Sequence, residues 1–466
     1  MFDKPLTSIC AVALIAFFVC EAFGQEAIAE KASSSLSNYL ANGDDTYQWE
    51  IMNQGKVGET RYAELRLTSQ TWKSLVWKHQ LFVLIPSTAK SNQDHGLLFI
   101  TGGGWNEELE TRRPVKSGED PPSLPGEARL FASMAEQFQT PIAVLMHVPF
   151  QPIFDGKYED QIIAYTFQEF LKTGDPTWPL LLPMVKSAVR GMDSTQEYLK
   201  TQHQISIETF TISGASKRGW TTWLTGAVDE RATAIAPMVI DVLNMVPQME
   251  HQKFSWGDYS TEIDDYSERG IQEWMTTEKG KKLRQIVDPF SYRSQLSQPK
   301  LIMLGTNDAY WPVDALNLYW NQLEGQKHII YVPNAGHGLD DLGRVFGTMH
   351  GFHRAARGLE SMPQLKWKFE ETGHGMTLMF KSDELPDSVS LWTAKAESRD
   401  FREAKWSSKS IKVIDGQTLS VEVGRPKAGY RSFFLEASYD RNGLPMFLST
   451  NLRVLSTEGE SKPKQD

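Results

Sequence analysis

Residues 212–220 read Ile212-Ser213-Gly214-Ala215-Ser216-Lys217-Arg218-Gly219-Trp220. Every second residue from Ile205 to Thr211 is β-branched, as in a strand, and residues 221–228 form an apolar stretch of helical character. Ser216 is therefore expected on a sharp strand-to-helix turn. Such a turn exposes a hydroxyl at the edge of a sheet, and the N-terminus of the following helix offers backbone N–H groups to a developing oxyanion. The pattern predicts a nucleophilic serine.

A serine nucleophile needs a base and an acid, and two later segments supply them. Residues 299–308 read as an apolar strand followed by a loop that contains Asp308. Residues 327–337 likewise read as an apolar strand followed by a loop that contains His337. Each residue alone has an ordinary explanation, namely a helix cap, a turn carboxylate and a loop histidine. Together, in the order Ser, Asp, His, they predict the catalytic triad Ser216, Asp308 and His337. Asp241, at the end of the predicted strand 232–240, is the alternative acid.

The turn departs from the usual G-x-S-x-G pattern. Arg218 stands where a small residue is expected, and Gly219 follows it. We therefore expect a turn of somewhat different shape, with Lys217 or Arg218 able to reach the site. A cation there could assist the oxyanion or bind an acidic substrate; the alternative for Arg218 is a surface cation paired with a carboxylate. Trp220 and Trp311 are candidate substrate-binding residues, since they lie near the predicted site loops.

A glycine-rich loop follows the predicted strand 97–101, and it contains Gly102, Gly103, Gly104 and Trp105. Glycines let a backbone approach a reacting carbonyl closely, as in the corresponding loops of lipases and esterases. We predict that an N–H group of this loop and the N–H of Lys217 form the oxyanion hole. A flexible surface turn is the alternative.

Five strings of the chain resemble the PhoPQ-activated pathogenicity-related protein family, over a region from about residue 35 to about residue 455. They are TSQTW (68–72), TGGGW (101–105), GASKRGW (214–220), GTND (305–308) and PNAGH (333–337). The resemblance implies a secreted or periplasmic α/β-hydrolase relative whose triad falls on Ser216, Asp308 and His337, and it implies no particular substrate. The S-K-R-G arrangement also resembles, more faintly, the serine-then-cation turn of glucuronoyl esterases.

The order of predicted elements indicates an α/β-hydrolase-like domain over residues 25–360. Leading strands at 47–52, 62–68 and 79–85 precede strands that alternate with helices. The later predicted strands are 97–101, 142–148 and 232–240, and the predicted helices are 126–138, 158–171, 183–201, 221–228 and 339–357. Such alternation predicts a mostly parallel sheet with helices on both faces, with ligands bound at the carboxyl ends of the strands.

Two segments break this alternation. Residues 242–298 are aromatic, acidic and rich in methionine, and we predict a helical cap over the site; the alternative is packing at the sheet edge without substrate contact. Residues 361–455 contain short alternating strands with Asp-Gly, Asn-Gly and Pro turns, which predict a C-terminal all-β sandwich domain. The charged, apolar-poor tail at 456–466 is predicted to be disordered.

The first residues predict export. Lys4 precedes the apolar run 9–20, and small residues occupy positions 22 and 24, so residues 1–24 are expected to be a signal peptide cleaved before Gln25. The run is too short to span a bilayer, so the periplasmic or secreted mature protein is not expected to insert stably into a membrane. The only cysteines, Cys10 and Cys20, lie inside this segment. The mature chain is therefore expected to contain no disulfide and no thiol nucleophile.

Several classes of function fit the sequence poorly. The formal net charge of −10 disfavours nucleic acid as a partner. No cofactor is expected, because the chain has neither a P-loop nor a dinucleotide fingerprint. His350 and His353 share a predicted helix face, but no third ligand is evident, so no metal is expected.

The sequence thus predicts an exported serine hydrolase, foremost a carboxylic ester hydrolase of small-molecule or glycan esters. A serine peptidase is one alternative, because the same triad cleaves amides. A non-catalytic secreted binding or signalling protein on a hydrolase fold is the other, because a fold does not fix a function.

Overall fold

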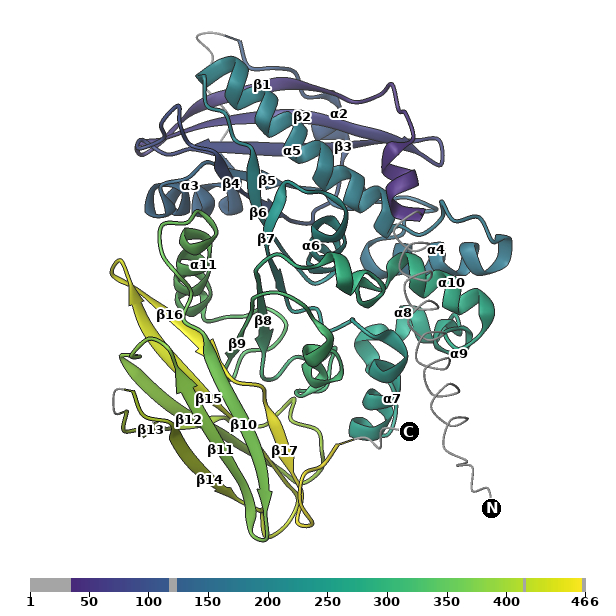
Figure 1. The fold of residues 1–466 in the computed structure, drawn as a ribbon. Helices are drawn as coiled ribbons and strands as arrows, with labels where there is room; N and C mark the ends of the chain where they lie inside the picture. Colours follow the sequence, from purple (N-terminus) through teal and green to yellow (C-terminus); the bar gives the residue numbers. More distant parts are fainter. Residues whose placement is uncertain (1–34, 117–123, 414–415, 463–466) are drawn as a thin grey trace, which may run out of the picture.

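A nine-stranded mixed sheet organises the larger part of the chain in this computed structural model, which describes residues 35–116, 124–413 and 416–462 (Figure 1). The strand order is β1-β2-β3-β5-β4-β6-β7-β8-β9. The strands are β1 (Gln48–Val57), β2 (Thr60–Trp72), β3 (Leu75–Ile85), β4 (His95–Ile100), β5 (Ile142–Leu145), β6 (Thr209–Ala215), β7 (Ala232–Met238), β8 (Lys300–Gly305) and β9 (Lys327–Val332). The first three strands and the β3–β5 pair are antiparallel, and the remaining pairs are parallel. The predicted α/β-hydrolase sheet is confirmed.

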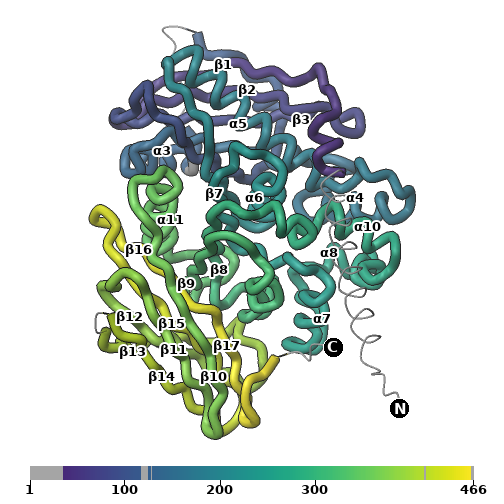
Figure 2. Tube along the Cα trace, in the orientation of Figure 1, coloured from purple at the N-terminus to yellow at the C-terminus, as the bar shows by residue number. Residues whose placement is uncertain are grey.

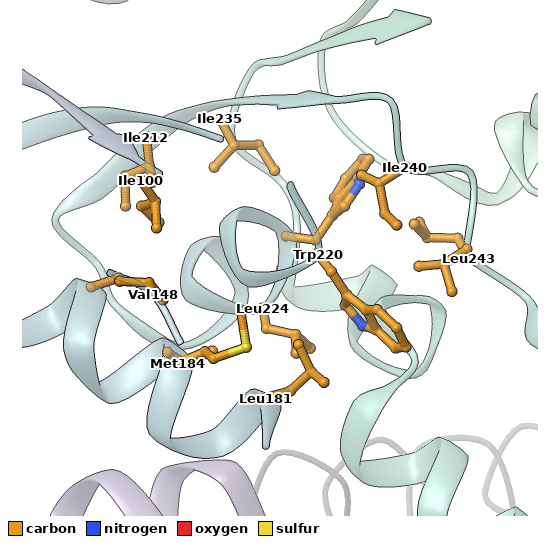
Figure 3. Close-up of a cluster of buried hydrophobic side chains, with 14 of the residues drawn as sticks. Ile100, Val148, Leu181, Met184, Ile212, Trp220, Leu224, Ile235, Ile240 and Leu243 are labelled. Atoms are coloured by element: carbon orange, nitrogen blue, oxygen red, sulfur yellow. The ribbon is translucent and has the colours of Figure 1, made fainter. Parts of the chain in front are cut away.

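Helices cover both faces of this sheet because its central strands are apolar on both sides. Along β5, Ala143 and Leu145 belong to one core cluster, whereas Ile142 and Val144 belong to the other. The first cluster contains α4 (Glu159–Thr173), α5 (Leu181–His203) and α6 (Lys217–Val228), and the second contains α3 (Gly126–Phe138) and α11 (Leu342–Ala356). Figure 3 shows α6 in the first cluster, where Trp220 and Leu224 lie among side chains of the sheet and of α5. Two-sided burial holds the carboxyl ends of the strands in fixed positions.

The segment expected as a cap contains helices in the structure. Between β7 and β8 the chain forms α7 (Met245–Trp256), α8 (Asp264–Ser267), α9 (Ile271–Trp274) and α10 (Glu278–Val287). Of these helices, α8, α9 and α10 contact α4, whereas α7 lies lower in the view, farther from β1–β3 (Figure 2). Every helix in the described part of the chain is too short or too polar to cross a lipid bilayer.

The C-terminal part is a two-sheet β-sandwich, as predicted. One sheet has the order β10-β11-β14 and the other β13-β12-β15-β16, with β17 pairing with β15. The strands are β10 (Leu365–Thr372), β11 (Gly375–Ser382), β12 (Ser388–Ala396), β13 (Ser407–Ile411), β14 (Leu419–Gly424), β15 (Tyr430–Arg441), β16 (Leu444–Ser449) and β17 (Arg453–Leu455). Apolar side chains of both sheets, such as Leu378 and Leu435, meet in one core.

Residues 456–462 of the predicted disordered tail are ordered in the structure, and residues 463–466 lie outside the described residues. Leu455 forms a β-bridge with Glu460, and the backbone carbonyl of Ser461 accepts a hydrogen bond of 2.6 Å from Arg399. These contacts hold residues 456–462 against the protein, although they are charged and apolar-poor. The predicted signal peptide, residues 1–24, lies outside the described residues.

Candidate active site

Ser216 occupies a strained turn between β6 and α6. Its backbone has φ 58° and ψ −127°, a region that residues with a side chain rarely adopt. Such a conformation costs on the order of 1–3 kcal/mol and persists only where the surroundings enforce it. Here the Ser216 N–H donates to the Met238 carbonyl at 2.9 Å, and its carbonyl accepts from the N–H of Trp220 at 3.0 Å. The turn directs the chain from the end of the sheet straight into a helix.

Two glycines explain how the turn tolerates Arg218. A Cβ on Gly214 would lie 2.8 Å from the Cβ of Arg218, so the absence of a side chain there makes room for the arginine. A Cβ on Gly219 would lie 2.7 Å from the Cγ2 of Ile240 and 2.8 Å from the Met238 carbonyl oxygen. The close approach of α6 to the next strand therefore falls at Gly219, one position later than the usual pattern places it. This shift accounts for the departure from G-x-S-x-G.

Asp308 and His337 form a hydrogen-bonded pair. The Nδ1 of His337 lies 2.9 Å from the Oδ2 of Asp308, and the Oδ1 of Asp308 accepts the N–H of Tyr310 at 2.8 Å. The Asp308 side chain is buried, and the imidazole packs on the Tyr310 ring with centroids 4.2 Å apart. Because the carboxylate accepts at Nδ1, that nitrogen carries a proton, and Nε2 of a neutral ring is free to act as a base.

Ser216 and His337 line the same cavity, whose volume is about 70 Å³. The Nε2 of His337 is buried, and within the described residues it has no hydrogen-bond partner. The cavity is mainly apolar, and its other lining residues include Phe167, Trp220, Met245, Met249, Ile263, Met275 and Trp311. Several of these come from the 242–298 segment, so that segment contacts the cavity. The structure thus brings together Ser216, the His337–Asp308 pair, Trp220 and Trp311.

Lys217 and Arg218 are both neutralised by carboxylates at the start of α4. Lys217 Nζ lies 2.9 Å from Glu159 and 3.0 Å from Asp160, while Arg218 binds both oxygens of Glu159 at 2.7 Å. Burial opposes ionisation of Glu159, but the hydrogen bonds and charge of Arg218 and the charge of Lys217 outweigh it and lower the pKa to about 2. Arg218 is buried rather than a surface cation. Two cations and two carboxylates leave no net charge to hold an acidic substrate.

The glycine-rich loop lies next to Arg218. A Cβ on Gly102 would be 2.4 Å from the Nη2 of Arg218, so the guanidinium packs directly on this backbone. The backbone N–H of Trp105 donates to the Gln151 carbonyl at 2.7 Å and is therefore not free to bind an oxyanion. Lys217 lines the cavity, whereas none of Gly102, Gly103, Gly104 and Trp105 does so. Of the predicted oxyanion donors, the structure brings the Lys217 backbone to the site.

Asp241, the alternative acid, does not pair with His337. Its carboxylate accepts the hydroxyl of Tyr319 at 2.5 Å and is 3 % exposed. Burial raises the pKa of Asp241 to about 7, and the nearby Asp308 charge acts in the same direction. Asp308 is thus the carboxylate that pairs with His337, and Asp241 and Asp308 line a separate small cavity.

The C-terminal sandwich braces the loops that carry the acid and the base, which sequence reasoning missed. The side-chain amide of Asn307, next to Asp308, donates to the carbonyls of Arg402 and Ala404 at 3.0 and 2.8 Å. Asn334, three residues before His337, exchanges two hydrogen bonds with the backbone of Trp406, at 3.1 and 2.8 Å. These contacts join residues far apart in sequence, so no local pattern could have indicated them.

His350 and His353 lie buried on α11, away from the cavity at Ser216. The Nδ1 of His353 is 2.9 Å from the hydroxyl of Thr211, and its ring packs on Phe138. No group of three or more potential metal-ligating side chains occurs within residues 35–116, 124–413 and 416–462. The two histidines therefore form part of the packing between α11 and the sheet.

The sheet order and the Ser216, His337 and Asp308 geometry define a protein of the α/β-hydrolase class. The chain belongs to the PhoPQ-activated pathogenicity-related protein family, which it matches over residues 36–402. It is 32% identical over 449 residues to "Autocrine proliferation repressor protein A" of Dictyostelium discoideum, an alignment that covers 88% of this chain and 87% of that protein. The family predicted from the sequence is confirmed.

Among solved structures, similar chains include acetyl xylan esterase 1 from Thermoanaerobacterium sp. JW/SL YS485, at 12% identity and a TM-score of 0.42, covering 70% of this chain and 93% of that one. A glucuronoyl esterase from Solibacter usitatus is also 12% identical, with a TM-score of 0.40, covering 70% of this chain and 91% of that one. Similarity at this level carries no argument about substrate or activity. The function must be argued from the site itself.

Proposed function

We propose that this protein is an exported serine hydrolase that cleaves carboxylic esters through an acyl-enzyme on Ser216. One observation carries the proposal. Asp308 fixes the Nδ1 side of His337, while the unpartnered Nε2 belongs to a ring that lines the same cavity as Ser216. A base held on one side and free on the other, beside a strained serine, is the arrangement that activates a hydroxyl.

The proposed reaction proceeds in two halves. Ser216 Oγ attacks the ester carbonyl carbon while His337 Nε2 takes the hydroxyl proton, and the Lys217 N–H at the start of α6 stabilises the oxyanion. The C–O bond to the leaving group then breaks, and the alkoxide receives the proton from His337. Water repeats the sequence on the acyl-enzyme, giving the carboxylic acid and regenerating Ser216.

The cavity favours a short apolar acyl group over an extended peptide. Its volume is about 70 Å³ and its walls are mainly aliphatic, aromatic and methionine side chains. Charged side chains at its edge neutralise one another, so a neutral acyl group is not penalised. Small-molecule or glycan esters are the proposed substrates, with a serine peptidase as the second enzymatic possibility.

A substrate panel tests the proposal. Purified mature protein is assayed with p-nitrophenyl acetate, butyrate and dodecanoate and with peptide p-nitroanilides. We expect hydrolysis of the short esters, weaker hydrolysis of the long one, and loss of all activity in Ser216→Ala and His337→Ala. Cleavage of the peptides but of none of the esters would show that the protein is a peptidase and not an esterase. Hydrolysis that persists in Ser216→Ala would contradict the serine mechanism.

The similarity to a protein named as an autocrine proliferation repressor supports a secreted signalling role as a second candidate. Such a role requires the fold and its surface but not the nucleophile. Proliferating cells treated with wild-type protein or with folded Ser216→Ala protein distinguish the two. An equal growth effect of both proteins favours signalling without turnover, whereas an effect that disappears with the serine favours signalling through hydrolysis.

Export itself is part of the proposal and rests on residues 1–24. N-terminal sequencing of the protein recovered from the medium or periplasm is expected to begin at Gln25. Recovery of an uncleaved chain from the cytoplasm would contradict it.

A further inference from the structure

A second, larger cavity of about 810 Å³ lies between the hydrolase domain and the C-terminal sandwich. Its walls come from residues 314–327, which include the short helices η3 (Ala315–Leu318) and η4 (Trp320–Gln322), from β10, and from residues 451–462. His251 of α7 also lines it. We call this cavity the interdomain cleft. It shares no lining residue with the cavity at Ser216, and its volume falls within the range of ligand-binding sites.

The interdomain cleft is cationic although the whole chain is acidic. Its basic lining residues are Lys327, Lys366, Lys368, Arg453 and Lys462, and its carboxylates are Asp314 and Glu460. Asp314 is bound by Arg399 at 2.6 Å, and Glu460 is bound by Arg453 and Lys462 at 3.2 and 3.3 Å. Lys368 pairs with Glu370 of the same strand at 2.6 Å. In the described part of the chain Lys366 has no carboxylate partner, and Lys327 Nζ donates only to the carbonyls of Trp320 and Leu323. A positive cleft in a protein of net charge −10 concentrates anions locally.

The cleft also presents an aromatic surface. Trp367 of β10 is half-buried and stacks on Trp320 with ring centroids 5.8 Å apart and an interplanar angle of 29°. Lys327 Nζ lies 4.8 Å from the Trp320 ring, which adds a cation–π contact. Indole rings offer large apolar faces beside polar groups, and the C–H face of a pyranose packs against such a ring.

His251 binds a carboxylate in the wall of the cleft. Its side chain is 1 % exposed, and its Nε2 lies 2.7 Å from the Oδ1 of Asp314. Its Nδ1 is buried and has no hydrogen-bond partner within the described residues. Because this Nδ1 is not accessible from the cleft, His251 acts through Asp314, whose carboxylate both His251 and Arg399 bind, so that Asp314 does not repel an anion in the cleft.

We propose that the interdomain cleft binds an acidic oligosaccharide, one that carries carboxylate or sulfate groups. The ammonium groups of Lys327 and Lys366, which have no carboxylate partner within the described residues, bind the anionic substituents, and the Trp367 ring packs on a sugar face. The site is separate from the one at Ser216, so it does not depend on the proposed hydrolysis.

Isothermal titration of the full mature protein tests the proposal with three hexasaccharides of similar length. Oligogalacturonate provides carboxylates, a heparin-derived hexamer provides sulfates, and maltohexaose is neutral. We expect at least one acidic hexamer to bind, with affinity that falls as NaCl rises, and maltohexaose to bind much more weakly. The acidic hexamer with the higher affinity shows whether the cleft prefers carboxylate or sulfate groups.

Charge reversal locates the binding. The double variant Lys366→Glu with Lys368→Glu is expected to bind the acidic hexamer with a dissociation constant at least about tenfold higher than that of the wild type. The matched control is Lys395→Glu with Lys409→Glu, which makes the same charge change on exposed residues of the same sandwich, in β12 and β13. The control is expected to bind as the wild type does, and thermal melting verifies that both double variants are folded.

Three outcomes would overturn the proposal. The first is that neither acidic hexamer binds the wild type at millimolar concentration. The second is that both double variants lose binding equally. The third is that hexaglutamate binds as tightly as the better of the two acidic hexamers. The last result would show that the cleft recognises charge alone and would favour an acidic peptide.

Discussion

Glu159 balances the charge of two cations beside the nucleophile, and its removal tests that role. Glu159→Gln leaves Arg218 and Lys217 buried with only Asp160 as a carboxylate partner. Breaking a fully buried pair costs about 3–5 kcal/mol, and because the Glu159 side chain is 37% exposed we expect about 2 kcal/mol. Urea unfolding of the wild type and the variant measures the difference.

The matched control is Glu169→Gln, farther along α4. Glu169 pairs with Lys172, whose side chain is 57% exposed. A surface pair of this kind contributes about 0–1 kcal/mol, so the control is expected to unfold nearly as the wild type does. Equal destabilisation by the two substitutions would show that Glu159 has no special role.

Asp241 is expected to make the protein less stable as the pH rises. Burial raises its folded-state pKa from 3.8 to about 7, so folding favours the protonated form. The resulting stabilisation is fully present below about pH 3.8, decreases as pH rises, and is lost above about pH 7. Asp241→Asn has no proton to lose and keeps an acceptor for Tyr319. We therefore expect a smaller loss of unfolding free energy between about pH 5 and about pH 8 in the variant than in the wild type.

Chemical unfolding at both pH values measures this effect. A wild-type protein whose pH dependence equals that of Asp241→Asn would show that Asp241 is ionised in the folded state. The comparison of slopes matters here, because the substitution also changes packing in a way that does not depend on pH.

At the scale of elements, the contact between α6 and the sheet depends on Gly219. Gly219→Ala places a Cβ 2.7 Å from Ile240 and 2.8 Å from the carbonyl of Met238, and backbone cannot move aside cheaply. Overpacking of this kind costs about 1–3 kcal/mol, and we expect it to shift the start of α6, where the proposed oxyanion donor, the Lys217 N–H, lies. We expect lower stability together with lower esterase activity.

Gly126→Ala is the control, because a Cβ on this exposed helical residue meets nothing within 4 Å. Replacing a helical glycine with alanine there is expected to be neutral or to stabilise by about 0.4–1 kcal/mol. Activity unchanged by Gly219→Ala would contradict the account of the turn.

Much of the fold could be predicted because the spacing of apolar residues along the chain reflects which side chains are buried in each helix or strand. The helix expected at 126–138 coincides with α3, and the strand expected at 232–240 ends two residues early, at Met238. The strand expected at 142–148 ends at Leu145, because the chain adopts a positive φ at His147 that apolar composition cannot reveal. The helix expected directly after Ser216 is α6, which begins at Lys217.

The site was predictable to the extent that position in a parallel sheet determines it. Ser216, Asp308 and His337 each follow a strand, and parallel strands end at one edge. The ion pair of Arg218 with Glu159 and the hydrogen bond from the Trp105 N–H to Gln151 were not predictable. Both depend on contacts between residues far apart in the sequence. Sequence composition likewise could not distinguish a surface cation from a buried one.

At the scale of the whole molecule, the sandwich holds the loops that carry Asp308 and His337. Asn334→Ala removes both hydrogen bonds to Trp406 and frees the loop that carries His337. Small misplacements of a catalytic group cost rate, so we expect kcat for a short ester to fall roughly tenfold with little change in KM. Asn321→Ala, an exposed asparagine on the hydrolase domain, is the control and is expected to leave kcat unchanged.

A purely structural role for Asn334 would lower stability without lowering the activity of the folded fraction. Active-site titration separates the two effects, because it counts competent sites. An unchanged rate per titrated site would contradict the bracing role of the sandwich.

The central claim is that His337 activates Ser216, and covalent labelling with a fluorophosphonate tests it most directly. Peptide mass mapping of the labelled wild type is expected to find one phosphonate, on Ser216. Labelling is expected to disappear in Ser216→Ala and to slow strongly in His337→Ala. A well-folded wild-type protein that remains unlabelled, or that carries the phosphonate on a different residue, would contradict the account.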